Sequence, residues 1–212
     1  DVGAMKLGDA KPPYWRLVEA GRAEVTGFEP QAEECARLVA SASPHQRYFP
    51  CALGEGGPAT LHVNAAKMTS SLYPSNTPLL ELFQNLSQLM RTVETVQLET
   101  KRLDDVAELG RVDLLKLDVQ GAELSVLRGA ERVLKDVLVV QAEVEFVPLY
   151  AGQPLFADVD AYLRSQGFML HTMDALQGRM FKPFWWGSDL NRGVRQVLWT
   201  DAVYVRDVTE WG

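Results

Sequence analysis

Short apolar runs alternate along the chain with stretches in which apolar residues recur every three or four positions. The first pattern is typical of buried β-strands and the second of amphipathic helices. The apolar runs predict strands at residues 1–4, 23–28, 47–53, 59–64, 93–98, 112–119, 137–144, 168–172 and 196–205. The helical spacing predicts helices at residues 12–21, 31–42, 79–90, 123–134 and 157–165.

The order of these elements predicts an α/β fold. Strands that alternate with helices are typical of a mostly parallel sheet whose two faces are both covered by helices. The glycine-rich stretch 54–58 is a turn after which residues 59–64 could pair back as a hairpin.

The length of 212 residues fits one domain, residues 1–212. Asp1 falls inside the first predicted strand, so we expect native sequence to precede it. Residues 175–195 form an aromatic insertion in this domain. Aromatic side chains in a loop either line a substrate site, anchor the loop to the core or form a dimer contact. We favour a substrate wall made from Phe181, Phe184, Trp185 and Trp186.

Charge and composition narrow the class of partner. The formal net charge is -7, and basic residues form no cluster beyond pairs such as Lys101 and Arg102. Nucleic-acid binding needs concentrated positive charge, so we expect a small neutral or polar substrate and no nucleic acid. Since no apolar run approaches the roughly 20 residues of a membrane-spanning helix, we expect no membrane span and a cytoplasmic location.

Cysteine and histidine usage predicts neither a disulfide framework nor a metal site. Cys35 and Cys51 are not closely spaced and are expected to be core residues of a reducing compartment. The three histidines His45, His62 and His171 are scattered and lack metal-ligand spacing.

The ends of three predicted strands carry candidate ligand-binding residues. Ligands of open α/β sheets bind where the strands end in loops. The first such loop is glycine-containing, the second ends in an acidic residue of the kind that accepts hydrogen bonds from ribose hydroxyls, and the third ends in an aspartate. These residues are Asp1, Gly3, Ala4 and Gly8, then Glu29, then Asp118.

The first loop also favours one kind of cofactor. A dinucleotide with a pyrophosphate needs a tight glycine-rich turn that leads directly into a helix N-terminus. Here Gly3 and Gly8 do not form that fingerprint, and Met5, Lys6, Leu7 and Lys11 precede the helix. S-adenosylmethionine carries a ribose and an adenine but no phosphate, so the loop favours it over NAD.

The most specific motif spans residues 112–130. Its strand reads VDLLKLDVQGAE from Val112 to Glu123, and VLRGA follows from Val126 to Ala130. This motif resembles the signature of FkbM-type methyltransferases. The segments 1–4 (DVGA), 27–30 (GFEP), 52–54 (ALG) and 70–72 (SSL) match the same family in order and spacing.

The resemblance runs from residue 1 to about residue 168 and implies a Rossmann-like class I methyltransferase fold. Such a fold has a seven-stranded, mostly parallel sheet whose last strand is antiparallel. The resemblance also implies that S-adenosylmethionine is the cofactor and that the acceptor is a hydroxyl oxygen, often on a sugar, glycan or polyketide-like molecule. We add Ala52 and Leu53, which lie in one of the matching segments, to the predicted cofactor site.

Two positions depart from the family pattern. Residues 5–8 replace the end of the usual front motif, which puts the geometry of the cofactor loop in question. Gln120 stands where the family often has glutamate, so no role for a charge there carries over.

Several polar residues are candidates for the chemistry. Asp118 is the first candidate for a residue near the transferring methyl, and Glu143 and His171 are alternative bases. Each has a structural alternative. Asp118 and Glu123 could cap the following helix, and a lone histidine such as His171 is more often a packed polar residue. Lys116 is expected to pair with a carboxylate such as Glu143, and Glu145 points the same way as Glu143.

Two rival functions stay open from the sequence. One is a nicotinamide-dependent oxidoreductase on the same general fold, which the missing glycine fingerprint disfavours. The other is a degenerate family member that binds the cofactor without catalysis, which the altered front loop and Gln120 leave open. The acceptor, a metal requirement and the oligomeric state, including a homo-oligomer, are not fixed by these residues.

Overall fold

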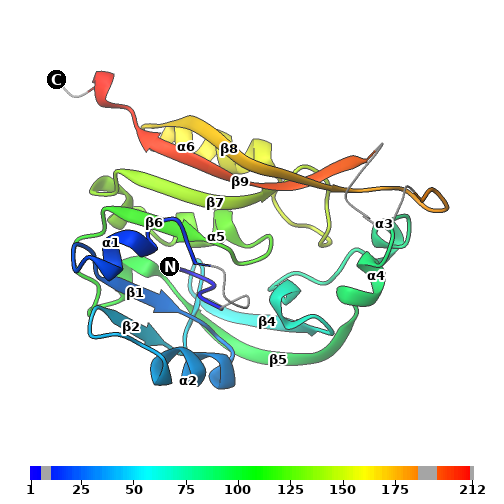
Figure 1. Ribbon diagram of the computed structural model, residues 1–212, viewed down its shortest axis with the longest axis horizontal. Helices are drawn as coiled ribbons and strands as arrows, with labels where there is room; N and C mark the ends of the chain where they lie inside the picture. Colours follow the sequence, from blue (N-terminus) through cyan, green and yellow to red (C-terminus); the bar gives the residue numbers. More distant parts are fainter. Residues whose placement is uncertain (6–10, 186–194, 211–212) are drawn as a thin grey trace.

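The computed structural model describes residues 1–5, 11–185 and 195–210. In chain order its strands are β1 (Val25–Phe28), β2 (Gln46–Phe49), β3 (Ala52–Leu53), β4 (Gly57–Asn64), β5 (Thr92–Lys101), β6 (Leu114–Leu117), β7 (Val139–Glu145), β8 (Phe168–Arg179) and β9 (Gln196–Arg206). Its α-helices are α1 (Trp15–Glu19), α2 (Ala32–Ala40), α3 (Thr77–Leu80), α4 (Leu86–Leu89), α5 (Glu123–Arg128) and α6 (Phe156–Ser165). This is an α/β protein with mixed sheets, shown in Figure 1.

Two of the sheets meet at the N-terminal segment. β1 and β2 form a parallel pair, and a four-stranded sheet has the order β6-β7-β9-β8. β6 and β7 are parallel, whereas β9 is antiparallel to both β7 and β8, as the sequence predicted for the last strand. Val2 forms isolated parallel bridges to Phe28 of β1 and to Leu117 of β6. The regular strands thus do not form the predicted continuous sheet of seven, although Val2 joins the two parts.

A third sheet has the order β3-β5-β4. The sequence predicted one strand over residues 47–53, but that segment forms two strands in different sheets: β2 pairs with β1 and β3 pairs with β5. Pro50, which cannot donate to a sheet ladder, stands between them. The expected hairpin partner of residues 59–64 was also wrong, because β4 pairs antiparallel with the distant β5.

The predicted helix over residues 79–90 is also two separate elements, α3 and α4. Asn85, between them, has a left-handed backbone with φ 62°, which no α-helix continues through. The predicted helix over residues 123–134 likewise ends early, with α5 stopping at Arg128 before Gly129. A Cβ on Gly129 would lie 2.0 Å from the Gly54 carbonyl oxygen, so this glycine permits close approach of the two segments.

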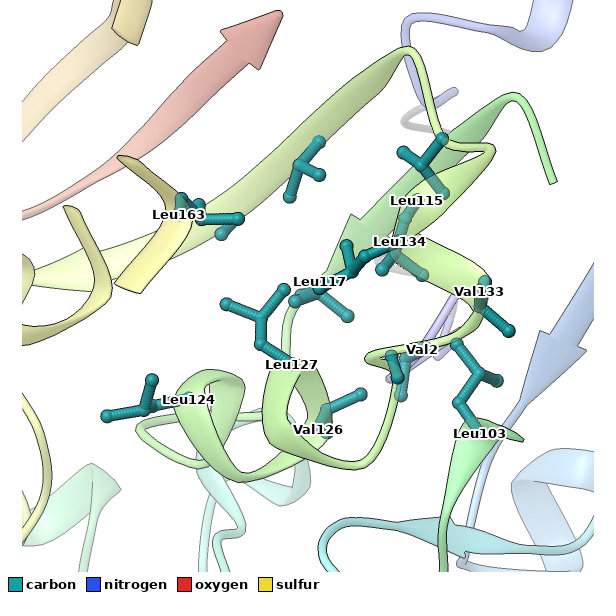
Figure 2. Packing of buried hydrophobic residues seen from close by; sticks show 14 of the residues in the cluster. Val2, Leu103, Leu115, Leu117, Leu124, Val126, Leu127, Val133, Leu134 and Leu163 are labelled. Carbon is teal, nitrogen blue, oxygen red and sulfur yellow. The ribbon is translucent and has the colours of Figure 1, made fainter. Parts of the chain in front are cut away.

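The main apolar core lies between β6, β7 and the helices α5 and α6. Figure 2 shows Leu115 and Leu117 of β6 beside Leu127 of α5 and Leu163 of α6. Leu117, Leu127 and Leu163 have no exposed surface, and truncating such a leucine to alanine typically costs about 2–5 kcal/mol. This packing fixes the end of β6, which carries the central motif.

A second apolar cluster holds the segment with α3 and α4 against β9. Its buried members are Leu80, Phe83, Leu86, Met90, Leu149, Tyr150 and Leu198. The end of β8 is anchored there as well, because Phe181 stacks on Phe83 with ring centroids 4.8 Å apart. β8 extends to Arg179, beyond the predicted end at residue 172, so residues 175–179 of the predicted insertion belong to a regular strand.

Candidate functional site

A cavity of about 350 Å³ opens where β1, β6 and β7 end. Small-molecule sites typically have volumes of about 300–1,000 Å³. Other elements contribute to its wall, among them β3, β4, α4, β8 and β9, and the last four of these are labelled in Figure 1. The charged side chains in the lining are Glu29, Lys67, Asp118, Glu143, Glu145 and Arg179.

Glu29 follows β1 directly and lines one end of the cavity. Its side chain is buried, with 3% exposed, and Oε1 accepts a hydrogen bond of 2.8 Å from the backbone N–H of Gln31. Burial raises the pKa of Glu29, and nearby Glu34 and Asp118 raise it further, while the bond from Gln31 lowers it. The result is an oriented acceptor group beside the cavity, where the sequence placed a ribose-binding carboxylate.

The N-terminal loop meets the same end of the cavity. Val2 and Gly3 line it, whereas Asp1 and Ala4 do not, and Gly8 lies outside the described residues. Gly3 has φ +76°, and a Cβ there would lie 1.8 Å from the carbonyl oxygen of Asp118. A side chain at this position would therefore collide with the loop after β6, so the close approach of these two loops requires glycine.

Apolar side chains complete this end. Ala52 and Leu53 of β3 are buried and line the cavity, as does Phe28 at the end of β1. The half-buried Cys51 also contributes to the lining. An apolar slot next to a buried carboxylate suits a flat ring attached to a polyhydroxylated group.

Asp118 follows β6 and faces the middle of the cavity. Its Oδ2 lies 3.4 Å from Lys116 Nζ, which also lies 3.6 Å from Asp1 Oδ1. The expected ion pair of Lys116 with a carboxylate is therefore confirmed, but its partners are Asp118 and Asp1 and not Glu143. The Asp118 side chain is 32% exposed, so its carboxylate is held in place yet accessible.

Gln120, which the sequence marked only as a departure from a pattern, joins the polar groups of the site. Its Nε2 donates to Asp118 Oδ1 at 2.9 Å and also to Glu143 Oε2. The Tyr150 hydroxyl lies 2.8 Å from Gln120 Oε1, and Ser71 Oγ donates to the Gln120 backbone carbonyl at 2.6 Å. No sequence pattern pointed to Tyr150, while Ser71 lies in a segment that matched the family pattern.

Glu143 and Glu145 line the cavity from β7. Burial raises the pKa of the Glu143 carboxyl well above its ordinary value, and Asp118, Glu145 and Glu123 add to the shift. Burial likewise raises the pKa of Glu145 well above its ordinary value. The site thus gathers carboxylates whose mutual repulsion favours protons on some of them at neutral pH.

Glu123, the first residue of α5, has a structural role in the apoprotein. Its side chain is 2% exposed, and Oε1 accepts a 2.8 Å hydrogen bond from the backbone N–H of Val119. Burial raises the pKa of Glu123 to about 7. This carboxyl holds the loop between β6 and α5 and does not line the cavity, so its role is structural, but α5 has no side-chain cap hydrogen bond and the capping alternative is not what the structure shows.

Two further predicted features lie apart from the cavity wall. His171, on β8, is exposed and does not line the cavity. In the aromatic insertion, Phe184 and Trp185 are 70% and 60% exposed and do not line it either, and Trp186 lies outside the described residues. Phe181, stacked on Phe83, fits the alternative of an anchor for the loop. Arg179 and Trp199 supply the β8 and β9 wall instead.

Within residues 1–5, 11–185 and 195–210, no group of three or more His, Cys, Asp or Glu side chains has the arrangement of a metal site. In the same residues no helix has the length and apolar character needed to cross a membrane.

Comparison with known sequences gives one family. The family described as methyltransferase FkbM domain matches residues 1–170. The 2-O-methyltransferase NoeI of Sinorhizobium fredii (strain NBRC 101917 / NGR234) is 30% identical over 170 residues, which cover 76% of this chain and 68% of that protein.

Two further similarities cover less of the related protein. Methyltransferase 1 of Beauveria bassiana (strain ARSEF 2860) is 38% identical over 87 residues, which are 39% of this chain and 33% of that one. The crystal structure of methyltransferase FkbM from Methylobacillus flagellatus KT aligns with 90% of this chain at 12% identity and a TM-score of 0.46. The alignment spans 39% of that structure's chain, so this chain matches about a third to two fifths of these two proteins.

Proposed function

The chain belongs to the FkbM methyltransferase family, and from that premise we propose that it transfers a methyl group from S-adenosylmethionine to a hydroxyl oxygen. The proposed acceptor is a sugar, glycan or polyketide-like small molecule. One observation carries the proposal: a single cavity has the buried Glu29 carboxylate at one end and the Asp118 and Glu143 carboxylates further along its wall.

The residues at the Glu29 end fit the donor. A ribose presents two hydroxyl donors, and the Glu29 carboxylate, already oriented by the Gln31 N–H, is an acceptor for them. Phe28, Ala52 and Leu53 offer apolar surface to an adenine ring. Gly3 brings the backbone close to the same space. These residues, and not Asp1, which lies outside the cavity lining, are the proposed cofactor site.

The chemistry that remains for the protein is alignment and one proton transfer. Bound S-adenosylmethionine supplies a methyl carbon already activated by its sulfonium sulfur. A bond forms between the acceptor oxygen and that carbon as the carbon–sulfur bond breaks, and its electron pair stays on sulfur. The hydroxyl proton passes to a carboxylate of the chain, for which Asp118 is our first candidate.

Asp118 suits this task because of where it is held. Lys116 Nζ at 3.4 Å and the Gln120 amide at 2.9 Å hold the Asp118 carboxylate in place at the cavity wall. Glu143, beside it on the same wall, is the alternative base. His171 is a weaker candidate because it does not line the cavity.

The charge of the wall bears on the acceptor. Four carboxyl groups and two cations line the cavity, so its wall offers an anionic acceptor no net positive charge. A neutral hydroxyl compound needs no such charge. The name of the relative NoeI, a 2-O-methyltransferase, supports transfer to oxygen.

The finer fold assignment is part of the proposal. Val2, paired with both β1 and β6, is the position that the first strand of a seven-stranded class I sheet would hold. Residues 1–212 as one domain, helices on both sheet faces, a cytoplasmic location and a homo-oligomer stay predictions from the sequence.

Two assays test the proposal against its rivals. Calorimetry with S-adenosylhomocysteine and with NAD should show binding of the first only. The second assay follows formation of S-adenosylhomocysteine from the donor with a panel of hydroxylated acceptors. Turnover that depends on the acceptor supports the methyltransferase, whereas tight donor binding without turnover on any acceptor favours the degenerate family member. Binding of NAD in place of the donor would contradict the proposal.

A further inference from the structure

The carboxamide of Gln120 lies between the two carboxylates proposed for proton transfer. Its Nε2 donates to Asp118 Oδ1 at 2.9 Å and to Glu143 Oε2. A side-chain amide nitrogen has two N–H donors, so both are used here. Since Asp118 follows β6 and Glu143 belongs to β7, one neutral side chain joins polar groups from two neighbouring strands.

Other contacts decide which end of the carboxamide faces the carboxylates. The single Tyr150 hydroxyl proton has two acceptors in reach, Gln120 Oε1 at 2.8 Å and the Thr69 backbone oxygen at 2.9 Å, and Tyr150 itself is 0% exposed within the second apolar cluster. Ser71 Oγ holds the Gln120 backbone carbonyl at 2.6 Å. The φ of Gln120, 55°, lies in the left-handed region, which non-glycine residues adopt at a cost. Backbone and side-chain oxygen are therefore both held, and the amide nitrogen is directed at the carboxylates.

We propose that Gln120 and Tyr150 form a positioning pair, in which the Tyr150 hydroxyl holds the Gln120 carboxamide and the carboxamide fixes the Asp118 and Glu143 side chains at the cavity wall. The inference rests on the proposed function for the catalytic task of those two carboxylates. Gln120 acts through them, because an N–H donor stabilises the ionised form of a carboxylate. The pair thereby keeps a proton acceptor available at the acceptor hydroxyl.

The charged surroundings explain why a neutral donor matters at this point. Among the described residues, the ionisable groups that face the two carboxylates are Lys116 on β6, Glu29 after β1, Glu123 on α5, Glu145 on β7, Asp201 on β9, and Tyr150. The cation in this set, Lys116, lies 3.4 Å from Asp118. Glu143 is surrounded mainly by carboxyl groups and is hydrogen-bonded to one of them, Asp118, whereas the Gln120 amide donates to its Oε2 and stabilises a negative charge there.

The test is a carboxyl ¹³C NMR titration of the full chain, labelled at Asp and Glu. Four proteins are compared: the wild type, Gln120→Met, Tyr150→Phe and the double variant. Methionine keeps the length of glutamine without its N–H donors, so the pKa of Glu143 should rise by about one unit or more. Tyr150→Phe should shift the same resonance in the same direction by less. The double variant should shift no further than Gln120→Met, because Tyr150 acts through Gln120.

A second glutamine–tyrosine pair provides the matched control. Gln46 is 7% exposed on β2, and its Nε2 donates to the Tyr48 hydroxyl at 2.8 Å, yet neither residue lines the cavity. Gln46→Met and Tyr48→Phe should leave the Glu143 titration at its wild-type position. If the substitutions act by a general loosening of the fold, the Glu143 pKa should shift in these control variants too. That result would overturn the proposal.

The remaining outcomes are equally decisive. An unchanged Glu143 pKa in Gln120→Met, or a double variant whose shift is the sum of the single shifts, would overturn the pair. If Gln120→Met does not fold, the Tyr150→Phe variant provides the test. An unchanged Glu143 pKa in Tyr150→Phe would then overturn the proposed pair. Once an acceptor is known, Gln120→Met should also lose about tenfold or more in kcat, with binding of S-adenosylhomocysteine within twofold of wild type. The titration needs no acceptor, so a failure of the proposed methyl transfer would leave its result intact.

Discussion

Replacing Glu29 with alanine should weaken donor binding by an amount that the structure allows us to estimate. The Glu29 carboxylate is 3% exposed and faces the cavity with one oxygen already bonded to the Gln31 N–H. A hydrogen bond to a charged group contributes about 1.5–3 kcal/mol. Its loss corresponds to a rise in Kd of about 10- to 150-fold for S-adenosylhomocysteine, measured by isothermal titration calorimetry.

A second variant separates ribose binding from local loosening. Glu29→Gln keeps an oxygen for the Gln31 N–H, at 2.8 Å in the wild type, but removes the negative charge. Burial raises the pKa of Glu29, so wild-type affinity should fall on acidification earlier than for an ordinary glutamate, and Glu29→Gln should lose that dependence. Glu24→Gln, at the exposed opposite end of β1, is the control and should bind as the wild type does. Affinity within twofold of wild type in Glu29→Ala would show that the cofactor site is misplaced.

Three further substitutions test other parts of the site. Asp118→Asn should keep the wild-type Tm, because asparagine retains a polar side chain of the same shape. If Asp118 is the base, kcat should fall by roughly 10²-fold. A stable and fully active variant would show that Asp118 is not part of the mechanism. In the wild type, burial raises the pKa of Glu123 from 4.5 in the unfolded chain to about 7 in the folded protein. The free energy of unfolding should therefore decline as pH rises from about 4.5 through 7. Chemical denaturation across this pH range should show a smaller decline for Glu123→Gln. Gly3→Ala places a Cβ 1.8 Å from the Asp118 carbonyl oxygen at a residue with φ +76°. The free energy of unfolding should fall by about 2 kcal/mol, which lowers Tm by about 4–8 °C. An unchanged Tm would mean that the loop can move aside.

The sequence predicted those parts of the fold that local patterns determine. Residues 112–119 and 137–144 are predicted as buried strands because their apolar runs are continuous, and they contain β6 and all of β7 but its last residue. The same local patterns led to wrong predictions where the fold depends on which strands pair with each other. Residues 47–53 have one apolar pattern, but the two halves bond to β1 and to the distant β5.

Among the candidate site residues, too, local patterns identified some and could not identify those that depend on long-range contacts. Glu29 and Asp118 follow predicted strands, so the rule that ligands bind where strands end was enough to select them for the cavity. The hydrogen bond between Tyr150 and Gln120 joins residues 30 positions apart, and no periodicity encodes it. Because Lys116 lies in an apolar strand, we could predict that it pairs with a carboxylate. Whether that carboxylate is Glu143 or Asp118 depends on the direction of the side chains in the folded sheet.

The most direct test of the central claim follows the methyl group itself. The chain is incubated with S-adenosylmethionine labelled with ¹³C in the methyl group and with a panel of neutral hydroxylated acceptors, and the products are analysed by NMR and mass spectrometry. We predict a ¹³C-methyl group bonded to an acceptor oxygen, with one S-adenosylhomocysteine formed for each product molecule. Label on nitrogen or carbon, or a donor that binds but yields no labelled product with any acceptor, would contradict the proposal.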